Sequence, residues 1–555
     1  MNHTRLENIP LEIRTHSDYR VRISDILFYF LFFALSINSK ESNAQLGMEW
    51  QKCFGGSQGD FAYDSKSTPD LGFVVVGHSA SNDGDISDSL GNGDILVLKL
   101  DSVGTIQWSK ILGGSQGDLA RSIDLTYDGG YIIGAVSTSN DGDVTGHHGE
   151  GDYWIIKLDS FGDIEWQRCY GGTDRDELFE IHQTFDSGFI VSGNTDSNDG
   201  DVVGQHACSG CTTDFWVLKL DSIGNIEWQN CLGGIFDEIN SGITQTSDSC
   251  YITAGSCFVD NGDVNGNHGL FDYWVVKLSN SGTILWQKCI GGSDNDACNS
   301  VISTIDGGCL VIGESASIDG DVTGHLGGWD SWLVKLNPNG GIDWEKSYGG
   351  PSYETGKVVT QTNDSSIYLA SLVFLSGGDI SGVIGGGDYW VVKTDMTGNL
   401  IWEKCFGGTG RDVPTSISVV NDNELLLVGY TESNDGDVTG NHGGICQFNP
   451  CEDVWVVKIG STNTSVLEIN TNMQSLKSFY SNNESRLTLF WSSTKTEECT
   501  IQIFDMTGKE IFNNKITSRL GENKIIIPFE TIGFQMYFVR ITEKESSLVG
   551  KFFGN

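Results

Sequence analysis

The chain has 555 residues, of which 74 are acidic and 33 are basic, so its formal net charge is −41. Binding to phosphate requires a basic surface, so this charge excludes nucleic acid as a partner and disfavours anionic membrane surfaces. Aromatic residues make up 10% of the chain, which argues against disorder, and the length allows several domains.

The N-terminal segment, residues 1–44, has the features of a secretory signal peptide. An apolar run from Ile26 to Leu35 follows three arginines and is too short to span a bilayer. Small residues at 42–44, before Gln45, offer a cleavage site. We therefore expect export, which permits disulfides among the 14 cysteines, and no transmembrane segment in the mature chain.

An internal repeat follows, marked by a tryptophan that recurs every 58 residues and once after 62. Gly-Gly follows each tryptophan five residues later, and an acid follows it ten residues later. The tryptophans are Trp50, Trp108, Trp166, Trp228, Trp286, Trp344 and Trp402. The acids are Asp60, Asp118, Asp176, Glu238, Asp296, Glu354 and Asp412.

Each repeat contains four short alternating segments that predict strands, and none shows the 3.6-residue period of a helix. In the second repeat they are 106–112, 120–127, 131–137 and 153–158, separated by turns that contain glycine. Four strands in a unit of about 58 residues are typical of a propeller blade, and seven units predict seven blades.

The ends of the repeat region predict how the ring closes. The region begins with the strand 48–54 and ends with the strand 454–459. Elsewhere in the repeat region, the equivalents of these two strands are joined by a tight turn and are therefore hairpin neighbours. Pairing these two strands completes the seventh blade and removes the open edge. We therefore predict an all-β chain with a seven-bladed β-propeller at 45–459, and not a linear solenoid, because no capping repeat is visible.

The repeat also contains a longer motif that is shared with a known family of repeats. The run from Asp152 to Asp176 reads D-Y-W-x-x-K-L-D-x-x-G-x-I-x-W, continues to a Gly-Gly turn and an aspartate, and recurs in the other repeats. It resembles the seven-bladed β-propeller repeat family of secreted bacterial proteins. The resemblance implies the fold and no particular chemistry.

The last part of the chain, residues 475–555, alternates apolar and polar residues around Phe504–Lys509 and ends in Lys551–Phe553. It resembles the C-terminal sorting domain of the type IX secretion system, a small β-sandwich, although Tyr480-Ser481-Asn482-Asn483 stands where that family usually has Y-P-N-P. The resemblance implies a Gram-negative cell, recognition by the type IX machinery, and release or surface attachment outside the outer membrane. Residues 460–474, rich in Ser, Thr and Asn, are the predicted linker.

The loops between the third and fourth strands carry Asn-Asp-Gly-Asp or a close variant. Closely spaced oxygens on a bent loop suit calcium, whereas Asn and Asp also cap turns through backbone amides, and both interpretations stay open. The candidate calcium ligands are Asp83, Asp85, Asp141, Asp143, Asp199, Asp201, Asp263, Asp319, Asp321, Asp435 and Asp437. Histidines just beyond are expected to pack the loops, because loops on separate blades do not converge as a zinc site requires. They are His147, His148, His206, His268, His325 and His442.

The cysteines fall into two main groups. Cys208 and Cys211 lie in an insertion of the third repeat, and Cys446 and Cys451 lie in the matching loop of the seventh. We predict that each pair forms a local disulfide, the alternatives being a redox motif or half of a zinc site. A second group shares one strand position and is expected to act as small buried hydrophobes. It consists of Cys53, Cys169, Cys231, Cys289 and Cys405.

A lysine recurs in every fourth strand, as regularly as the repeat acid. We predict a buried ion pair between the two in most blades, with Lys99 and Asp60 as the first pair. The alternative is that the seven acids form a functional ring around the channel.

Two functions remain open. The first is a secreted or cell-surface binding or adhesion module without catalysis, whose ligand is a glycan or a protein. The second is a hydrolase or lyase acting on polysaccharide, which needs only two carboxylates and no longer motif. Clustered buried acids with raised pKa at the channel would favour the enzyme, and an exposed aromatic patch on one face would favour binding.

Overall fold

The computed structural model describes residues 46–461 except 87–89, 207–211, 444 and 447–448, and residues 477–554 except 482–485, 494, 497, 505–508, 520, 529–534 and 543–546. Two compact units divide the chain, Met1–Thr462 and Asn463–Asn555, and each is described by itself. The predicted signal peptide and residues 462–474 of the predicted linker lie outside the described residues.

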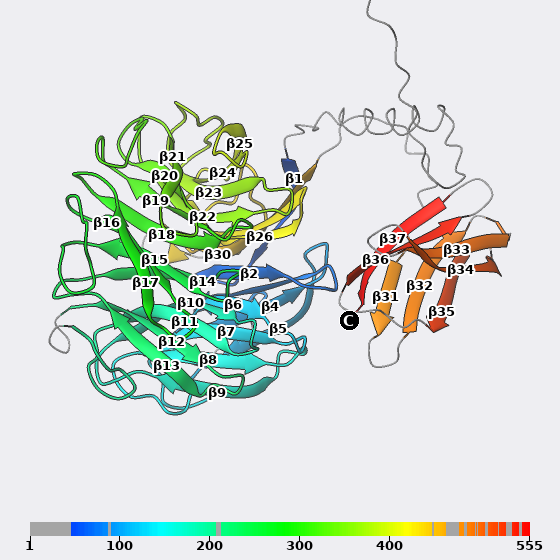
Figure 1. The fold of residues 1–555 in the computed structure, drawn as a ribbon, viewed down its shortest axis with the longest axis horizontal. Helices are drawn as coiled ribbons and strands as arrows, with labels where there is room; N and C mark the ends of the chain where they lie inside the picture. Colours follow the sequence, from blue (N-terminus) through cyan, green and yellow to red (C-terminus); the bar gives the residue numbers. More distant parts are fainter. Residues whose placement is uncertain are drawn as a thin grey trace, which may run out of the picture. The chain divides into compact units, whose positions relative to one another are not determined.

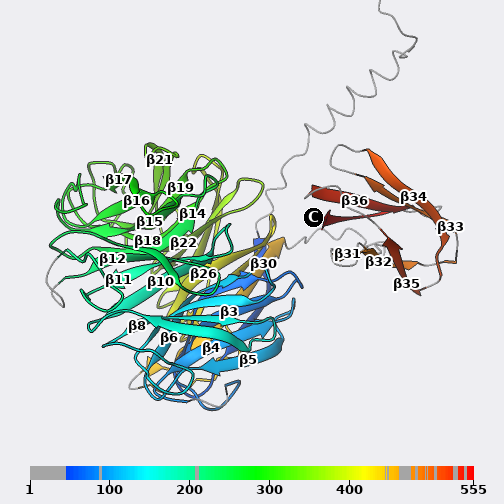
Figure 2. The same ribbon diagram turned by 60° about the horizontal axis from the view of Figure 1, so that its bottom comes forward.

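The first unit contains seven four-stranded antiparallel sheets, which follow one another around the propeller in Figures 1 and 2. The inner strands are β2 (Asp60–Ser67), β6 (Asp118–Leu125), β10 (Asp176–Gln183), β14 (Ile239–Gln245), β18 (Asp296–Ser303), β22 (Glu354–Gln361) and β26 (Asp412–Asn421). The second strands are β3 (Phe73–Ser79), β7 (Tyr131–Ser137), β11 (Phe189–Thr195), β15 (Tyr251–Cys257), β19 (Cys309–Ser315), β23 (Ile367–Val373) and β27 (Glu424–Thr431).

The third strands are the most buried of each blade. They are β4 (Asp94–Leu100), β8 (Asp152–Leu158), β12 (Asp214–Leu220), β16 (Asp272–Leu278), β20 (Asp330–Leu336), β24 (Asp388–Thr394) and β30 (Asp453–Ser461). The outer strands are β5 (Ile106–Leu112), β9 (Ile164–Tyr170), β13 (Ile226–Leu232), β17 (Ile284–Ile290), β21 (Ile342–Tyr348), β25 (Leu400–Phe406) and β1 (Leu46–Phe54). A short hairpin, β28 (Ile445–Cys446) with β29 (Asn449–Pro450), lies in the long loop of the seventh blade.

The ring closes as the sequence predicts. Strand β1 pairs antiparallel with β30, with Met48 opposite Ile459 and Phe54 opposite Val454. The inner strands of the first and seventh blades also meet, since the hydroxyl oxygens of Ser65 and Ser418 lie 3.0 Å apart. The seventh blade is therefore built from both ends of the repeat region, which leaves no open seam.

Every inner strand carries a β-bulge at the same position, between the residues two and four places after the repeat acid. The bulge residues are Tyr63, Arg121, Phe179, Ser241, Asn299, Lys357 and Thr415, which we call the bulge layer. A bulge re-aims side chains, and three of these bond to the backbone of the next blade. Ser241 donates to the Cys298 carbonyl at 2.7 Å, and Asn299 donates to that of Gly356 at 2.9 Å. Thr415 donates to the Ala62 carbonyl at 2.9 Å.

The antiparallel strand order gives the ring two unlike faces. Turns after the inner strand and after the third strand lie on one face, which we call the turn face. Gly-Gly turns and the long loops after the second strand lie on the opposite face, which we call the loop face. The inner strands of neighbouring blades contact one another around the channel, each running from the loop face to the turn face.

The second unit is a sandwich of two sheets. One has the order β31 (Lys477–Ser481), β32 (Arg486–Ser493), β35 (Gly521–Pro528). The other has the order β34 (Glu510–Thr517), β33 (Glu498–Phe504), β36 (Gln535–Thr542), β37 (Ser547–Gly554). Alternate residues of β33, such as Ile501 and Ile503, pack with Leu487 and Val539 in a core between the sheets.

Closure by β1 is testable by moving this strand. Deleting 46–54 exposes the edge of β30 and removes the buried Leu46, Cys53 and Phe54, which we expect to destabilise the ring by about 5 kcal/mol. Placing the same nine residues after Ser461, joined by a copy of the turn 159–162, should restore the melting temperature, measured by circular dichroism. Equal melting temperatures for the deletion and the parent would contradict the closure.

Candidate functional site

The repeat acid at the start of each inner strand is buried, and in five of the seven blades it bonds to three segments. In the third blade, Asp176 accepts hydrogen bonds from the backbone amide of Gly172 at 2.8 Å and from the Ser197 hydroxyl at 3.0 Å. Its second oxygen accepts a bond from the Thr195 hydroxyl at the end of β11. The same pattern holds Asp60, Asp118, Asp296 and Asp412, so this acid fixes the Gly-Gly turn to its own blade.

The predicted pairing of this acid with the strand lysine is wrong. The Nζ atom of Lys99 lies 2.8 Å from Asp70, an acid of the turn after the inner strand, and not beside Asp60. Lys157, Lys219, Lys277 and Lys335 pair in the same way with Asp128, Asp186, Asp248 and Asp306. The lysine lies near the turn-face end of its strand and the repeat acid at the loop-face end, so the two cannot meet.

In the last two blades of the ring this lysine has other partners. Lys458 pairs with Glu49 and Glu424, each at 2.9 Å. Lys393 lies over the ring of Tyr368, 5.1 Å from its centroid. The lysine is therefore buried or half-buried in every blade, and in six of the seven it pairs with an acid other than the predicted one.

The fourth and sixth blades vary the repeat acid. There the second strand ends in Cys257 or Val373, which offer no hydroxyl of the kind that Thr195 provides, and the acid is the longer Glu238 or Glu354. Burial raises the pKa of Glu238 to about 8 and that of Glu354 to about 7, and it raises that of Asp176 to about 7. These acids face the blade interior, so the seven do not form a functional ring in the channel.

In the candidate calcium loops, the first aspartate of the motif accepts a hydrogen bond from a backbone amide. Asp83 accepts a bond from the amide of Ser57 at 2.7 Å, and the amide of Asp85 donates to the Gly55 carbonyl at 2.9 Å. Gly84 between them has φ +68°, and a Cβ there would lie 2.3 Å from the Gly55 oxygen. Asp141, Asp199, Asp319 and Asp435 cap their turns as Asp83 does.

The second loop acids, Asp143, Asp201, Asp263, Asp321 and Asp437, donate their amides as Asp85 does. Within the described ranges, no group of three or more His, Cys, Asp or Glu side chains is placed to hold a metal. Calcium binding stays a prediction that the loop geometry does not require.

The loop histidines pack against a second buried acid, the first residue of the third strand. Nδ1 of His148 lies 2.8 Å from Asp152, and His206, His268, His325 and His442 meet Asp214, Asp272, Asp330 and Asp453 likewise. This is the loop-packing role expected of them. The five strand cysteines are buried, and the sulfur of Cys289 lies 3.4 Å from that of Cys257. Cys208, Cys211 and the side chain of Cys446 lie outside the described residues, so both disulfides stay predictions.

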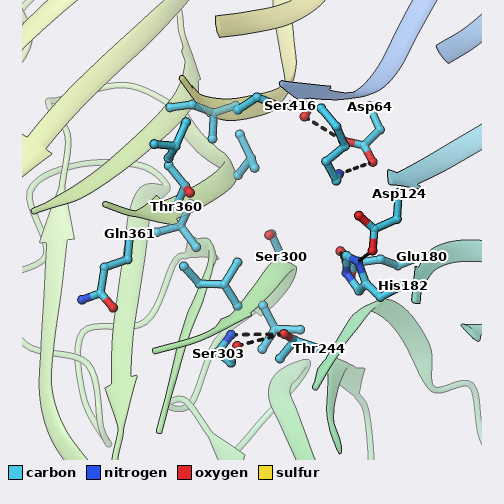
Figure 3. Close-up of a pocket in the computed structure, with 18 of the residues that line it drawn as sticks. Asp64, Asp124, Glu180, His182, Thr244, Ser300, Ser303, Thr360, Gln361 and Ser416 are labelled. Atoms are coloured by element: carbon cyan, nitrogen blue, oxygen red, sulfur yellow. Dashed lines mark hydrogen bonds and ion pairs between the residues drawn. The ribbon is translucent and has the colours of Figure 1, made fainter. Parts of the chain in front are cut away.

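The turn-face half of the channel contains a cavity of about 520 Å³ with one charged wall (Figure 3). His182 lies between Asp124 at 3.3 Å and Glu180 at 3.0 Å, and Lys66 pairs with Asp64 at 2.8 Å. The opposite wall carries uncharged residues such as Thr360 and Gln361.

These carboxylates tie neighbouring blades together. Asp64 accepts the amide of Ile123 at 3.0 Å, and Asp124 accepts that of Gln183 at 3.1 Å. Glu180 accepts the amide of Ile243 at 2.7 Å. Burial acts to raise the pKa of Asp124, but His182, Lys66 and the Gln183 amide together outweigh it and lower that pKa. Burial likewise acts to lower the pKa of His182, yet Glu180 and Asp124 raise it to about 10, so the wall carries paired charges and no poised acid.

Aromatic side chains gather in the loop-face halves of the inner strands β2 and β10. Phe61 stacks on His78 with ring centroids 4.8 Å apart and meets Tyr430 edge-on at 4.9 Å. The guanidinium of Arg121 lies between two rings, 5.1 Å from the centroid of Tyr63 and 5.4 Å from that of Phe179. Burial, with Arg121 nearby, lowers the pKa of His78 to about 4, so His78 is neutral near pH 7.

The loop face of the fourth to sixth blades departs from the repeat. Phe236 stands where the first two blades have Gln58 and Gln116, and it meets Phe258, which meets Phe271. The departures, which we call the apolar arc, are Ile235, Phe236, Phe258, Leu270, Phe271, Trp329, Tyr353, Phe374 and Leu375. Tyr353 is 59% exposed and Phe236 43% exposed. This arc is the feature that distinguishes one side of the ring most clearly from the other.

Two acids lie on the loop face of the seventh blade, next to the sixth. Glu432 and Glu452 belong to the seventh blade, and burial together with Glu452 raises the pKa of Glu432. A raised carboxyl pKa is a property of general acids, so this pair could serve hydrolysis. Asp196 of the third blade is a second such acid, because burial raises its pKa and Asp237 and Glu177 act in the same direction.

Comparison with known proteins identifies the second unit. Residues 481–554 match the family model described as a secretion system C-terminal sorting domain. The chain is therefore exported by type IX secretion to the cell surface or the medium, and the sorting domain engages the secretion machinery. Among the described residues, no helix is long and apolar enough to cross a membrane.

The propeller has more distant similarities. The chain is 22% identical over 374 residues to regulatory protein FlaEY of Caulobacter vibrioides, which covers 60% of this chain and 38% of that protein. It therefore spans well under half of that relative's length. Solved structures with a similar arrangement include puromycin hydrolase (11% identity, 79% of this chain and 60% of that chain, TM-score 0.42) and the BBS1 fragment bound to ARL6 (10% identity, 76% and 98%, TM-score 0.39). At these scores the likenesses say nothing about function.

The buried acids predict an unusual dependence of stability on pH. Because their pKa values exceed the value of about 4 of an unfolded chain, the folded protein binds more protons between about pH 4 and 8. The free energy of unfolding should then fall as pH rises from 5 to 8. We expect Glu238→Gln to reduce this fall by about 1 kcal/mol or more, and the exposed Glu150→Gln to leave it unchanged. Unfolding monitored by circular dichroism across this range measures it, and stability that rises with pH would contradict the assignment.

Proposed function

We propose that the exported propeller is a binding module without catalysis, and that its ligand docks on the loop face at the apolar arc. The single observation behind this proposal is that polar or small repeat positions become apolar or aromatic together in adjacent blades. Scaffold residues repeat around a ring, whereas a ligand site needs an asymmetric surface. Aromatic side chains such as Tyr353 and Phe236 offer the flat apolar faces that bind sugar rings or apolar partner surfaces.

The turn face also exposes apolar side chains, but in a different arrangement. Tyr127 and Phe185 occupy one repeated turn position and are separated by the width of a blade. They do not contact one another as Phe258 and Phe271 do, and they therefore make a matched control for the arc.

The charged wall of the channel supports binding over catalysis. Its three carboxylates already accept backbone amides from the next blade, and their charges are offset by Lys66 and His182. A general acid must hold a proton near neutral pH, and a pKa lowered as that of Asp124 is does not allow it.

The alternative is a secreted polysaccharide hydrolase or lyase. The observation that favours it is the Glu432–Glu452 pair, in which one carboxyl has a raised pKa beside a second acid. If it were the catalytic pair, Glu432→Gln would abolish release of reducing ends from polysaccharide and leave binding intact.

Binding can be tested with the secreted full-length chain. On an array of glycans and surface proteins, we expect Tyr353→Ala and Phe236→Ala each to weaken binding at least about tenfold, because each removes an exposed ring from the arc. Tyr127→Ala removes an equally exposed ring from the turn face and should bind normally.

Two outcomes would contradict the proposal. Loss of binding in Tyr127→Ala with no loss in the arc variants would place the site on the turn face. Release of reducing ends by the parent chain but not by Glu432→Gln would establish the enzyme instead.

A further inference from the structure

The bulge layer holds two positive side chains and no negative one. Five of its seven residues are neutral, and the remaining two are Arg121 in β6 and Lys357 in β22. The three small polar members bond to the next blade, as described above, but neither cation does. The layer lies three residues beyond the repeat acid, in the loop-face half of each inner strand, and its two cations come from strands on different sides of the ring.

Arg121 is held in place without being neutralised. Its guanidinium is fixed between the rings of Tyr63 and Phe179, and its buried Nε atom has no hydrogen-bond partner. Among the residues that the structure describes, no carboxylate forms an ion pair with it. The channel's other cations differ in this respect, because Lys66 pairs with Asp64 and His182 with Glu180.

Lys357 shares only the missing ion pair. Burial lowers its pKa, Glu314 opposes that change and Arg411 adds to it, yet Lys357 makes no ion pair with a described carboxylate. A half-buried cation without a carboxylate partner costs free energy, yet this chain leaves both cations unpaired although 74 of its residues are acidic. Such a cation is the group that an anionic ligand would neutralise.

We propose that the bulge layer binds the anionic group of a sugar at the end of a glycan, with Arg121 as the principal contact and Lys357 as the second. This deepens the proposed function, on which it rests, because the apolar arc would hold the neutral part of the same glycan. A guanidinium clamped on both faces presents its edge to the ligand, and that edge bonds a planar carboxylate or a sulfate oxygen pair bidentately.

The net charge of the chain limits the ligand further. At −41, the propeller repels a long polyanion, so a ligand with charges along its whole length is disfavoured. A glycan that is neutral except for an acidic sugar at its end carries little charge to be repelled, and its single anionic group can still pair with Arg121 and Lys357.

Calorimetry on the secreted full-length chain tests this with two sugars that differ in one group. We expect glucuronate to bind at least about tenfold more tightly than glucose, and polyglucuronate to bind no better per chain end. Glucose 6-sulfate distinguishes the source of the charge: binding equal to that of glucuronate supports an anion site open to both groups, and weaker binding supports a carboxylate site. Equal affinity for glucuronate and glucose overturns the proposal. A short peptide with a free C-terminal carboxylate that binds as tightly as glucuronate also overturns it.

Variants assign the contact to its residues. Arg121→Gln should lose the preference for glucuronate, Arg121→Lys should recover it in part, and Lys357→Gln should weaken it less. Lys288→Gln on the outer strand β17 removes the same charge away from the channel and should keep the preference. If Arg121→Gln does not fold, Lys357→Gln and the sugar comparison on the parent chain still decide. A chain that binds neutral glycans through the arc without preferring glucuronate would leave the proposed function standing and overturn this inference.

Discussion

In each blade a buried carboxylate at the start of the inner strand accepts a bond from the preceding Gly-Gly turn, and in five of the seven blades it also accepts bonds from two further segments. Asp176 accepts the Gly172 amide of the preceding turn and hydroxyls at the end of β11 and in the loop beyond it. This fixes where the inner strand begins, and therefore where the bulge falls and which side chains face the channel. The glycines beside it are required, because a Cβ at Gly171 would lie 2.6 Å from a carboxylate oxygen of Asp176.

A scaffold repeated seven times leaves function to the positions that do not repeat. They gather in three places: the charged wall of the turn-face cavity, the bulge layer, and the apolar arc. In the first place every charge has a partner and the carboxylates tie blades together. The apolar arc keeps exposed aromatic rings and the bulge layer keeps cations without a carboxylate partner, which are features of a surface that binds a ligand.

The sequence predicted the ring because its period, its Gly-Gly turns and its unmatched end strands all follow from local rules. It failed at the ion pair, since Lys99 and Asp60 are equally regular but lie at opposite ends of the blade, and regularity carries no information about strand direction. The true partner, Asp70, was available in the sequence as the acid of the turn. The apolar arc could also have been found by asking, position by position, where Gln58 and Gln116 become Phe236. The stacking of Arg121 could not have been found in this way, because it depends on β-bulges whose positions no residue type predicts.

The central claim is that the ligand is recognised at the loop face, by the apolar arc of the fourth to sixth blades together with Arg121 in β6 of the second blade. Hydrogen–deuterium exchange of the secreted chain, with and without an oligosaccharide ending in glucuronate, tests it most directly. The account predicts protection of peptides that contain 235–239, 270–271, 329 and 353, together with the inner strand around Arg121, and unchanged exchange in the turns around Tyr127 and Phe185. Protection confined to those turns, or spread evenly over all seven blades, would contradict it.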